Sequence, residues 1–246
     1  MILYPIGTSK SCLQAVTFLE RDVISLLDHP APEVSHLLLD IPSFLPDGRL
    51  RDGSRIETIL RMLPPEICII GGNLNHPALK EYRRIDLLQD PDYLAQNAAI
   101  TADCALKLAA PLMSTTFRDS AALITGWGRI GKCLAAMLHG LGCRVIIAAR
   151  KASDRAMICA LGYEATDYHQ INRILPQCTL LFNTVPAMVC SQEIPEGCIA
   201  LELASLDGIT GKNVITARGL PGKYAPKTTG KLIARRILEL YKEEAL

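Results

Sequence analysis

Three glycines spaced as G-x-G-x-x-G are the clearest chemical signature in the chain. They fall in the segment Gly126-Trp127-Gly128-Arg129-Ile130-Gly131, between an apolar run typical of a strand and an amphipathic run typical of a helix. Gly126 permits a tight turn, Gly128 lets a pyrophosphate approach the backbone, and Gly131 allows close packing of helix on strand. The start of the helix adds free N–H groups that favour phosphate. All six residues are therefore predicted to bind a dinucleotide; the alternative is a glycine turn kept for packing alone.

The end of the next predicted strand is basic where an acidic residue is usual. Residues 144–149 predict the strand, and Arg150, Lys151, Ser153 and Arg155 follow it. An acidic residue there would bind the 2′-hydroxyl of NAD, whereas guanidinium groups bind a 2′-phosphate through charge-assisted, bidentate hydrogen bonds. The four residues are therefore predicted to bind the adenosine end of the cofactor and to favour NADP. The alternative is that Arg150 stacks on adenine, Lys151 and Arg155 are solvated, and NAD is equally usable.

Two later strand ends are expected to line the nicotinamide side of the cofactor. The apolar run "TLLFN" ends in Asn183-Thr184-Val185-Pro186, and the run "CIALEL" ends in Ala204-Ser205. Ligands of an open parallel sheet collect beyond the carboxyl ends of its strands. As isolated features, both segments would simply be turns at strand ends.

Strand and helix patterns alternate along the whole chain, which implies parallel sheets joined by right-handed crossovers. Strands are expected at residues 2–6, 36–41, 66–72, 120–125, 144–149, near 163, 179–183, 198–203 and 213–217, and the apolar segment 84–89 closes the first half. Apolar residues at helical spacing predict helices at residues 12–27, 56–63, 92–113, 130–141, 154–161, 167–175 and 226–242.

The predicted fold class is α/β with two domains. Residues 1–91 are expected to form an N-terminal flavodoxin-like or Rossmann-like domain on the substrate side, and residues 92–117 a connector helix; the alternative for the latter is another packed helix. Residues 118–225 are expected to form a dinucleotide-binding Rossmann domain with a parallel sheet. Residues 226–246 are expected to form a C-terminal helix that packs back toward the N-terminal domain, with Pro226 at its first position.

Composition excludes several classes of protein. The net charge of the 246 residues is +1 and only 5% are aromatic, so neither a global field nor a stacking surface favours nucleic acid. The nine cysteines form no C-x-x-C pair, which indicates small buried residues in a reducing cytoplasm and argues against a metal site. No signal peptide and no membrane span is expected.

Several segments resemble the A-chain family of bacterial dipicolinate synthases. These are "GWGRIGKCLA", "AARKASDRA", "NTVP", "ELAS", "NAAITADCALKLA" and, most specifically, "GLPGKYAPKTTGKLIA" at residues 219–234. The resemblance implies the two-domain architecture of D-2-hydroxyacid dehydrogenases and adenosylhomocysteine hydrolase. It also implies an enzyme that oxidises 4-hydroxy-tetrahydrodipicolinate to dipicolinate for spores, with NAD or NADP as oxidant and with a flavoprotein-like partner, the B chain of the synthase. A homo-oligomer in the cytoplasm is expected.

The implied substrate is a dicarboxylate, which needs cations and N–H groups to hold it. Lys227 and Thr228 are expected in the first turn of the last helix, where free N–H groups favour an anion, and Lys223 lies in the preceding loop. The alternative is that both lysines are solvated. The first half is expected to contribute further contacts, from Thr8, Ser9, Lys10 and Asn73.

The catalytic candidates are Asp103, Lys227 and a water held by Asn183 or Ser205. Because aromatisation supplies much of the driving force, positioning can matter more than a strong base. The five histidines show no nucleophile or metal pattern.

The chain departs from the family in ways that keep two other functions open. It is shorter in its first half, it has Leu206-Asp207-Gly208-Ile209 where the family has x-Pro-Gly-Gly, and it has Asp103-Cys104 where the family has Glu-Gly. One alternative is an NADP-binding regulatory or scaffold subunit without chemistry of its own. The other is a shikimate-type NADP dehydrogenase, which would need an N-terminal Asn-Val-Thr-x-Pro-x-Lys segment that the chain lacks.

Overall fold

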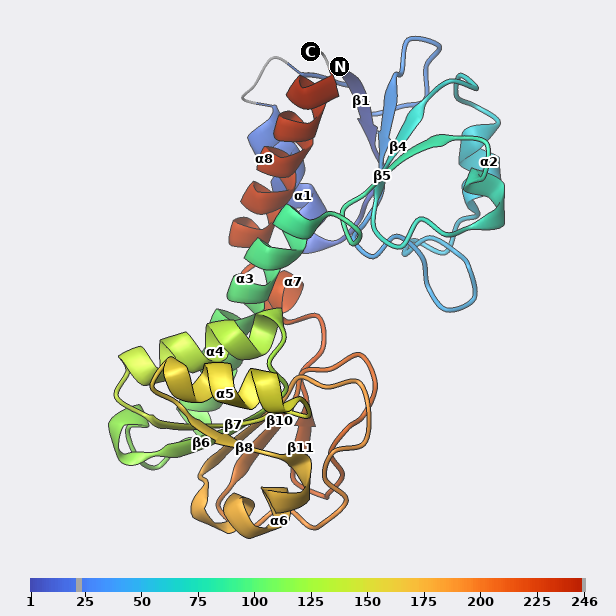
Figure 1. Cartoon of the computed structure of the whole chain (residues 1–246). Coiled ribbons are helices and arrows are strands. Elements are labelled where there is room, and N and C mark those ends of the chain that lie inside the picture. The colour runs from blue at the N-terminus through green and yellow to red at the C-terminus, as the bar shows by residue number, and fades with distance from the viewer. Residues whose placement is uncertain (21–23, 245–246) are drawn as a thin grey trace. The chain divides into compact units, whose positions relative to one another are not determined.

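The computed structural model describes residues 1–20 and 24–244, and it divides into two compact units (Figure 1). Unit 1 combines Met1–Asn97 with Pro221–Leu246, and unit 2 is Ala98–Leu220. The long helix α3 (Pro91–Ala109) begins in unit 1 and ends in unit 2, and the chain returns to unit 1 within the short helix α7 (Leu220–Tyr224). The predicted connector therefore corresponds to a helix that both units share.

Unit 1 contains a five-stranded parallel sheet. Its strands are β1 (Ile2–Pro5), β2 (Ser25–Leu26), β3 (His36–Leu38), β4 (Cys68–Gly71) and β5 (Arg83–Asp86), in the order β2-β1-β3-β4-β5. This is the flavodoxin-like strand order, in which the chain reverses direction across the sheet between β1 and β3. The loops after these two strands therefore lie at the natural ligand edge of the unit.

Helices cover both faces of this sheet (Figure 1). The short helix α2 (Ile56–Leu60) packs with Leu37, Leu39 and Ile69 into one core, next to the 3₁₀ turn η1 (Pro77–Leu79). The other face carries α1 (Lys10–Leu19) and α8 (Pro226–Glu244), which pack against each other. A Cβ on Gly230 of α8 would lie 2.5 Å from Cβ of Gln14, so this glycine lets the two helix backbones meet.

Unit 2 contains a six-stranded parallel sheet in the order β11-β10-β9-β6-β7-β8. The strands are β6 (Ala121–Thr125), β7 (Arg144–Ala148), β8 (Glu164–Thr166), β9 (Leu180–Asn183), β10 (Ile199–Glu202) and β11 (Val214–Thr216). This is the Rossmann order, with its direction change between β6 and β9. Both sheets confirm the predicted α/β fold class.

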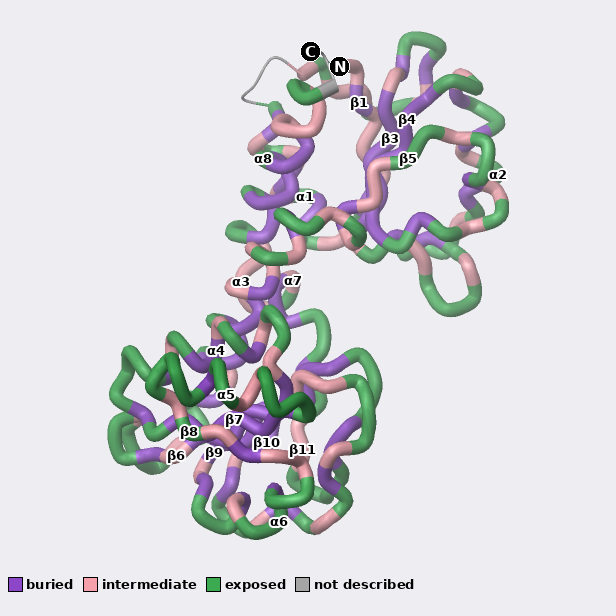
Figure 2. The backbone as a smooth tube through the Cα atoms, in the orientation of Figure 1, coloured by how far each residue is buried: buried purple, intermediate pink, exposed green. Residues whose placement is uncertain are grey.

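The central strands of unit 2 are buried on both faces (Figure 2). Helices α4 (Arg129–Gly140) and α5 (Ala152–Ala160) lie along one face, and α6 (Ile171–Ile174) lies on the other (Figure 1). The predicted helix at residues 167–175 is broken, because 3₁₀ turns η4 (Tyr168–Gln170) and η5 (Leu175–Gln177) flank α6 and η5 contains Pro176. The predicted helix at 92–113 likewise ends early, in the 3₁₀ turn η2 (Ala110–Leu112) with Pro111. A further 3₁₀ turn, η3 (Phe117–Asp119), precedes β6.

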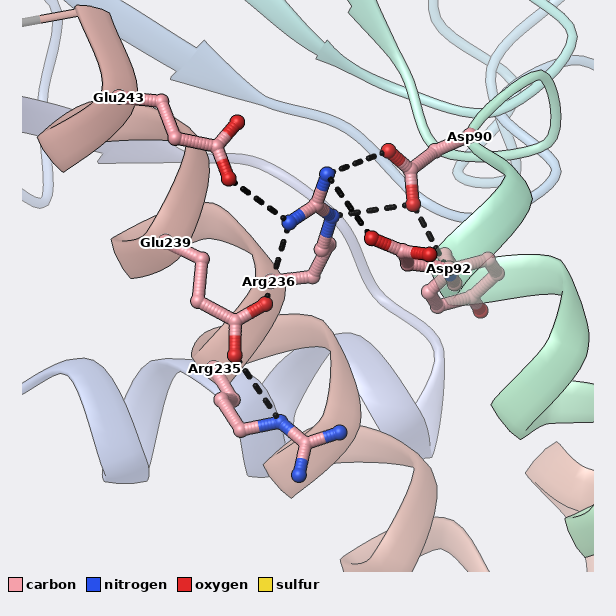
Figure 3. A network of polar contacts seen from close by, with 7 residues as sticks. Asp90, Asp92, Arg235, Arg236, Glu239 and Glu243 are labelled. Carbon is pink, nitrogen blue, oxygen red and sulfur yellow. Dashed lines mark hydrogen bonds and ion pairs between the residues drawn. The ribbon is translucent and has the colours of Figure 1, made fainter.

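A buried ion pair joins α8 to the start of α3 inside unit 1 (Figure 3). Arg236 donates two hydrogen bonds to Asp90, of 3.0 and 2.9 Å, and its side chain is only 9% exposed. Asp90 also accepts a hydrogen bond from Tyr93 N at the beginning of α3. Glu239 and Glu243 lie 3.2 and 3.4 Å from the guanidinium. Arg236 therefore fixes two helices that are far apart in the sequence.

We expect Arg236→Ala to destabilise the fold by about 3 kcal/mol or more, because it leaves the Asp90 carboxylate without its buried cation. The neighbouring Arg235 is the matched control: its side chain is 50% exposed and its contact with Glu239 is 3.5 Å, so Arg235→Ala should change the free energy of unfolding by at most about 0.5 kcal/mol. Urea unfolding followed by circular dichroism measures both. Equal, small effects of the two substitutions on the free energy of unfolding would contradict a stabilising role of the Arg236–Asp90 pair.

The same pair should make part of the stability depend on acid. Burial alone would raise the pKa of Asp90, but hydrogen bonds from Arg236 and from the backbone of α3 outweigh it and hold the pKa below its ordinary value of 3.8. The stabilisation is therefore complete above that value and is lost as the pH falls through the lower pKa of the folded protein. The difference in stability between wild type and Arg236→Ala should shrink as unfolding is repeated from pH 6 down to about pH 3. A constant difference over this range would show that the ion pair is not its source.

Candidate dinucleotide-binding site

The glycine-rich loop of unit 2 has the geometry that the spacing predicts. Gly126, directly after β6, has a φ of 98°, and a Cβ there would lie 2.6 Å from Oγ1 of Thr184. A Cβ on Gly131 would collide with the carbonyl oxygen of Gly126. These two positions therefore require glycine, one for the turn between neighbouring strand ends and the other for the close approach of α4.

Gly128 differs from both, because no atom of the described residues lies within 4 Å of the place where its Cβ would be. It is exposed and is the N-cap of α4, with no side-chain hydrogen bond to the first-turn N–H groups. Open space above the backbone, together with uncapped N–H groups, fits a bound diphosphate. The residues present thus suit a dinucleotide at this loop.

The other members of the motif surround this space in different ways. Arg129 is exposed in the first turn of α4, and Ile130 is half-buried. Trp127 is half-buried and packs edge-on against Tyr163, with ring centres 6.1 Å apart, while Nζ of Lys132 lies 5.6 Å from its ring centre. Trp127 is the only tryptophan in the chain, which makes its fluorescence a direct reporter on the loop.

The four polar residues after β7 differ in what their side chains do: three are exposed, and one binds the backbone of its own turn. Arg150, Lys151 and Ser153 are exposed, and Lys151 is the N-cap of α5. Arg155, by contrast, donates from Nη1 to the carbonyl oxygens of Ala149 and Arg150, both at 2.8 Å. Arg155 therefore closes the turn, and Arg150, Lys151 and Ser153 are the groups that remain open to a phosphate.

Asn183, at the end of β9, is wholly buried and its amide is fully used. Its Oδ1 accepts hydrogen bonds from the hydroxyl of Thr125 and from Val185 N. Its Nδ2 donates to the carbonyl oxygen of Val185 and to both carboxylate oxygens of Glu202. This geometry leaves no atom for a substrate or water and does not support the predicted catalytic role. Asn183 instead holds its own loop.

The rest of this loop and the loop after β10 lie beside it. Thr184 is half-buried and donates to the carbonyl oxygen of Thr125 at 2.7 Å; Val185 is half-buried and Pro186 is exposed. Ala204 is buried and Ser205 is exposed. The carboxyl ends of β6, β9 and β10, which are neighbours in the sheet, thus bring the predicted residues to one edge.

Glu202 also lies at this edge, and no role was predicted for it from the sequence. It is the last residue of β10 and has no solvent exposure. Besides Asn183, its carboxylate accepts hydrogen bonds from the backbone of Ala204, Gly208 and Ile209, at 2.9, 2.8 and 3.2 Å. The available signal was a charged residue inside the apolar run "IALELA", because a buried carboxylate needs several partners.

In unit 1, the corresponding helix start is already occupied by a carboxylate. Asp40, just beyond β3 and 4% exposed, accepts hydrogen bonds from the backbone of Thr8 and Ser9, both at 2.9 Å. The hydroxyl of Ser9 caps α1 by accepting from Cys12 N. The backbone donors of Thr8 and Ser9, two predicted substrate residues, are therefore committed to Asp40, while Lys10 is exposed. Burial, helped by the charge of Asp40, raises the pKa of Cys12 to about 12, so this cysteine is an unreactive thiol.

The remaining predicted residues are exposed and belong to different elements of the two units. Asn73 has a φ of 56°, and its backbone N–H donates to Asp86. The residue is exposed. Nζ of Lys223 lies 5.2 Å from the ring centre of Tyr224, and Lys227 and Thr228 are exposed in the first turn of α8. Asp103 is exposed on the part of α3 that belongs to unit 2. Within the described residues, no group of three His, Cys, Asp or Glu side chains could hold a metal ion.

We expect Gly128→Ala to weaken binding of NADPH at least about tenfold, because its methyl group would fill the space above the uncapped helix start. The fold should lose only about 1 kcal/mol or less, since the φ of −82° suits alanine and nothing is within 4 Å. Gly131→Ala is the contrasting variant, and should destabilise the fold by about 2 kcal/mol or more through its clash with Gly126. Energy transfer from Trp127 to NADPH and urea unfolding separate the two effects. Unchanged NADPH affinity in Gly128→Ala would contradict the phosphate assignment.

Comparison with known proteins agrees with this geometry. Residues 95–194 match the family described as D-isomer specific 2-hydroxyacid dehydrogenase, NAD binding domain. The A chain of dipicolinate synthase from Bacillus subtilis (strain 168) is 25% identical over 197 residues, which cover 73% of this chain and 66% of that protein, just under two thirds of its length. In the part of the chain that the structure describes, no helix has the length and apolar character needed to cross a membrane.

Solved structures extend the likeness to nearly the whole chain. The dipicolinate synthase A chains from Bacillus halodurans and from Bacillus subtilis each superpose with a TM-score of 0.82 at 22% identity, over 98% and 99% of this chain and 97% and 96% of theirs. A transhydrogenase from Sinorhizobium meliloti follows at 0.71 and 11% identity, over 99% of this chain and 94% of its own. At these identities the structures establish the fold, and the sequence match carries the relationship. The protein is a homologue of the dipicolinate synthase A chain that contains an NAD-binding domain of the 2-hydroxyacid dehydrogenase kind.

Proposed function

We propose that the chain is an NADP-dependent dehydrogenase that oxidises 4-hydroxy-tetrahydrodipicolinate to dipicolinate. The substrate would lose one water, one hydride to the oxidised cofactor and one proton, which together leave an aromatic pyridine dicarboxylate. The observation that carries the proposal is the open, uncapped start of α4 above Gly128, in a unit with Rossmann topology. The choice of substrate is proposed from the sequence match to the A chain of a dipicolinate synthase.

The cofactor would be held by three groups of residues in unit 2. The N–H groups around Gly128 and the side chain of Arg129 would bind the diphosphate. Arg150, Lys151 and Ser153, at the N-terminus of α5, would bind the 2′-phosphate. Thr184-Val185-Pro186 and Ala204-Ser205 would line the nicotinamide, whose C4 atom supplies the hydride-accepting chemistry when the cofactor is bound.

Substrate recognition is proposed for exposed residues of unit 1. Lys227 and Thr228, in the first turn of α8, combine a cation with free N–H groups and would hold a carboxylate, with Lys223 as a second cation. Thr8 can take part only through the acceptor lone pairs of its hydroxyl oxygen, because Asp40 accepts from its backbone N–H at 2.9 Å and from its hydroxyl at 3.4 Å. Asn73 would contribute its exposed amide. For the proton, Lys227, Asp103 and a water on Ser205 are the groups with free polar atoms.

The same relationship supports a proposal for partners and location. We propose that the chain acts with the B chain of a dipicolinate synthase and forms a homo-oligomer, as the likeness to one component of that enzyme suggests. All nine cysteines are free thiols, which suits the reducing cytoplasm.

A coupled assay tests the reaction. The purified chain would be mixed with freshly generated 4-hydroxy-tetrahydrodipicolinate and NADP or NAD, with and without the synthase B chain. Reduced cofactor at 340 nm and dipicolinate in the ultraviolet should rise together and in equal amounts. Cofactor binding without turnover, even with the B chain present, would contradict the proposed reaction and favour the alternative of an NADP-binding regulatory or scaffold subunit.

Arg150→Asp should weaken NADP binding about tenfold or more while sparing NAD, because a carboxylate at the end of β7 repels a 2′-phosphate and accepts from a 2′-hydroxyl. Dissociation constants for NADPH and NADH, measured by quenching of Trp127, give the ratio directly. Arg173→Asp is the matched control, since Arg173 is exposed on α6 of the same unit and should leave the ratio unchanged. Unchanged NADPH affinity in Arg150→Asp would refute the basic pocket.

A further inference from the structure

Glu202 is a fully buried acid whose hydrogen-bond partners, among the residues that the structure describes, are all neutral groups. Its Oε1 accepts from Asn183 Nδ2 at 2.7 Å and from Ala204 N at 2.9 Å. Its Oε2 accepts from Asn183 Nδ2 and Gly208 N, both at 2.8 Å, and from Ile209 N at 3.2 Å. Every one of these partners is a donor, which is the arrangement of an ionised carboxylate.

The hydrogen bonds solvate this charge without neutralising it. A buried ion is normally paired with an opposite charge, as Asp90 is with Arg236. The N–H groups around Glu202 carry partial charges only. The guanidinium of Arg218, which donates to the carbonyl oxygen of Ala204, is paired with Asp207 at 2.6 Å, so the charge of Glu202 is not neutralised by a partner of its own. Its field is weakly screened, because protein rather than water surrounds it.

The carboxylate also organises the three strand ends of that edge. Through Asn183 it reaches Thr125, the residue before Gly126, and Val185 in the loop after β9. Through Gly208 it fixes the loop after β10, and the carbonyl of Gly208 in turn accepts from Val189 N at 2.7 Å. A Cβ on Gly208 would lie 2.5 Å from Nδ2 of Asn183, so the packing allows little movement.

We propose that Glu202 is a positioning residue that also selects the oxidised form of the cofactor. This inference rests on the cofactor-binding part of the proposed function. Ala204-Ser205 and Thr184-Val185-Pro186, the two segments that Glu202 holds, are those assigned to the nicotinamide ring. The ring carries a positive charge in NADP⁺ and none in NADPH, whereas the rest of the cofactor is the same. A fixed negative charge behind these segments therefore stabilises NADP⁺ relative to NADPH.

Such selection serves a dehydrogenase that runs toward oxidation. The oxidised cofactor must bind first, and the reduced one must leave after the hydride has been transferred. A purely structural role for Glu202 would lower the affinity for both forms by the same factor. Charge removal instead changes the ratio of the two dissociation constants, which makes that ratio the informative quantity.

The test uses the full chain and measures dissociation constants of NADP⁺ and NADPH by Trp127 fluorescence, beside urea unfolding. Wild type should bind NADP⁺ at least as tightly as NADPH. Glu202→Gln keeps the shape but removes the charge, and should shift the ratio about five- to tenfold toward NADPH. Adding Asn183→Asp to Glu202→Gln returns a negative charge to the network and should restore most of the ratio. Glu196→Gln, at an exposed acid before β10, is the matched control and should change nothing.

The dissociation constants distinguish an electrostatic role of Glu202 from a purely structural one. Equal weakening of both cofactor forms in Glu202→Gln, with the ratio unchanged, overturns the electrostatic role. Should that variant not fold, the wild-type constants still decide, because tighter binding of NADPH than of NADP⁺ overturns the proposal. Neither measurement needs the substrate, so a normal ratio with no turnover rejects the proposed reaction alone. A wild-type chain that binds neither form rejects both proposals.

Discussion

In each unit a loop leads from a central strand into a helix and presents backbone N–H groups that need an acceptor, and the two units differ in what lies opposite these groups. In unit 1 the loop into α1 donates to Asp40, a carboxylate from the neighbouring strand end. In unit 2 the start of α4 meets open space above Gly128. Both sheets have doubly wound parallel topology, so topology alone does not determine which of them binds a phosphate. In unit 1 a carboxylate accepts from the loop before the helix, whereas among the described residues of unit 2 no side chain lies above Gly128, which favours unit 2 as the dinucleotide-binding unit.

A dinucleotide bound at this edge of unit 2 requires particular properties of the strand ends around the open space. A ligand edge must be rigid, although it consists of loops, and it must not be filled by its own side chains. Glu202 meets both demands because it lies below the edge and binds the loops from beneath. Asn183 extends the same network to β6. The exposed residues above it, such as Ser205, are thereby free to contact a ligand.

Much of this could be predicted from the sequence, because local patterns encode it. The spacing of Gly126, Gly128 and Gly131 and the alternation of apolar runs predict a Rossmann unit, and the structure has that topology. What could not be predicted depends on contacts between distant segments. Asp40 accepts from a loop 32 residues away, and Arg155 donates to the end of its own strand. The amide of Asn183 donates to Glu202, 19 residues later. From their residue types, Ser9, Arg155 and Asn183 were predicted to contact ligands. In the structure, the backbone N–H of Ser9 and the side chains of Arg155 and Asn183 form hydrogen bonds within the protein instead.

Two buried acids, Asp40 and Glu202, and the largely buried Asp90 show how the partners of a carboxylate relate to its role. Asp90 is paired with Arg236 at the joint between α3 and α8, where it only needs to hold helices together. Asp40 and Glu202 accept hydrogen bonds from neutral donors and lie at the carboxyl ends of parallel strands. A cation beside either would cancel its charge and add a long side chain to the edge. Backbone N–H groups satisfy the oxygens equally well but leave the net charge in place. Where a fold solvates an acid in this way at a ligand edge, its residual charge acts on whatever binds there, and a nicotinamide ring that alternates between positive and neutral is a ligand on which that charge has the largest differential effect.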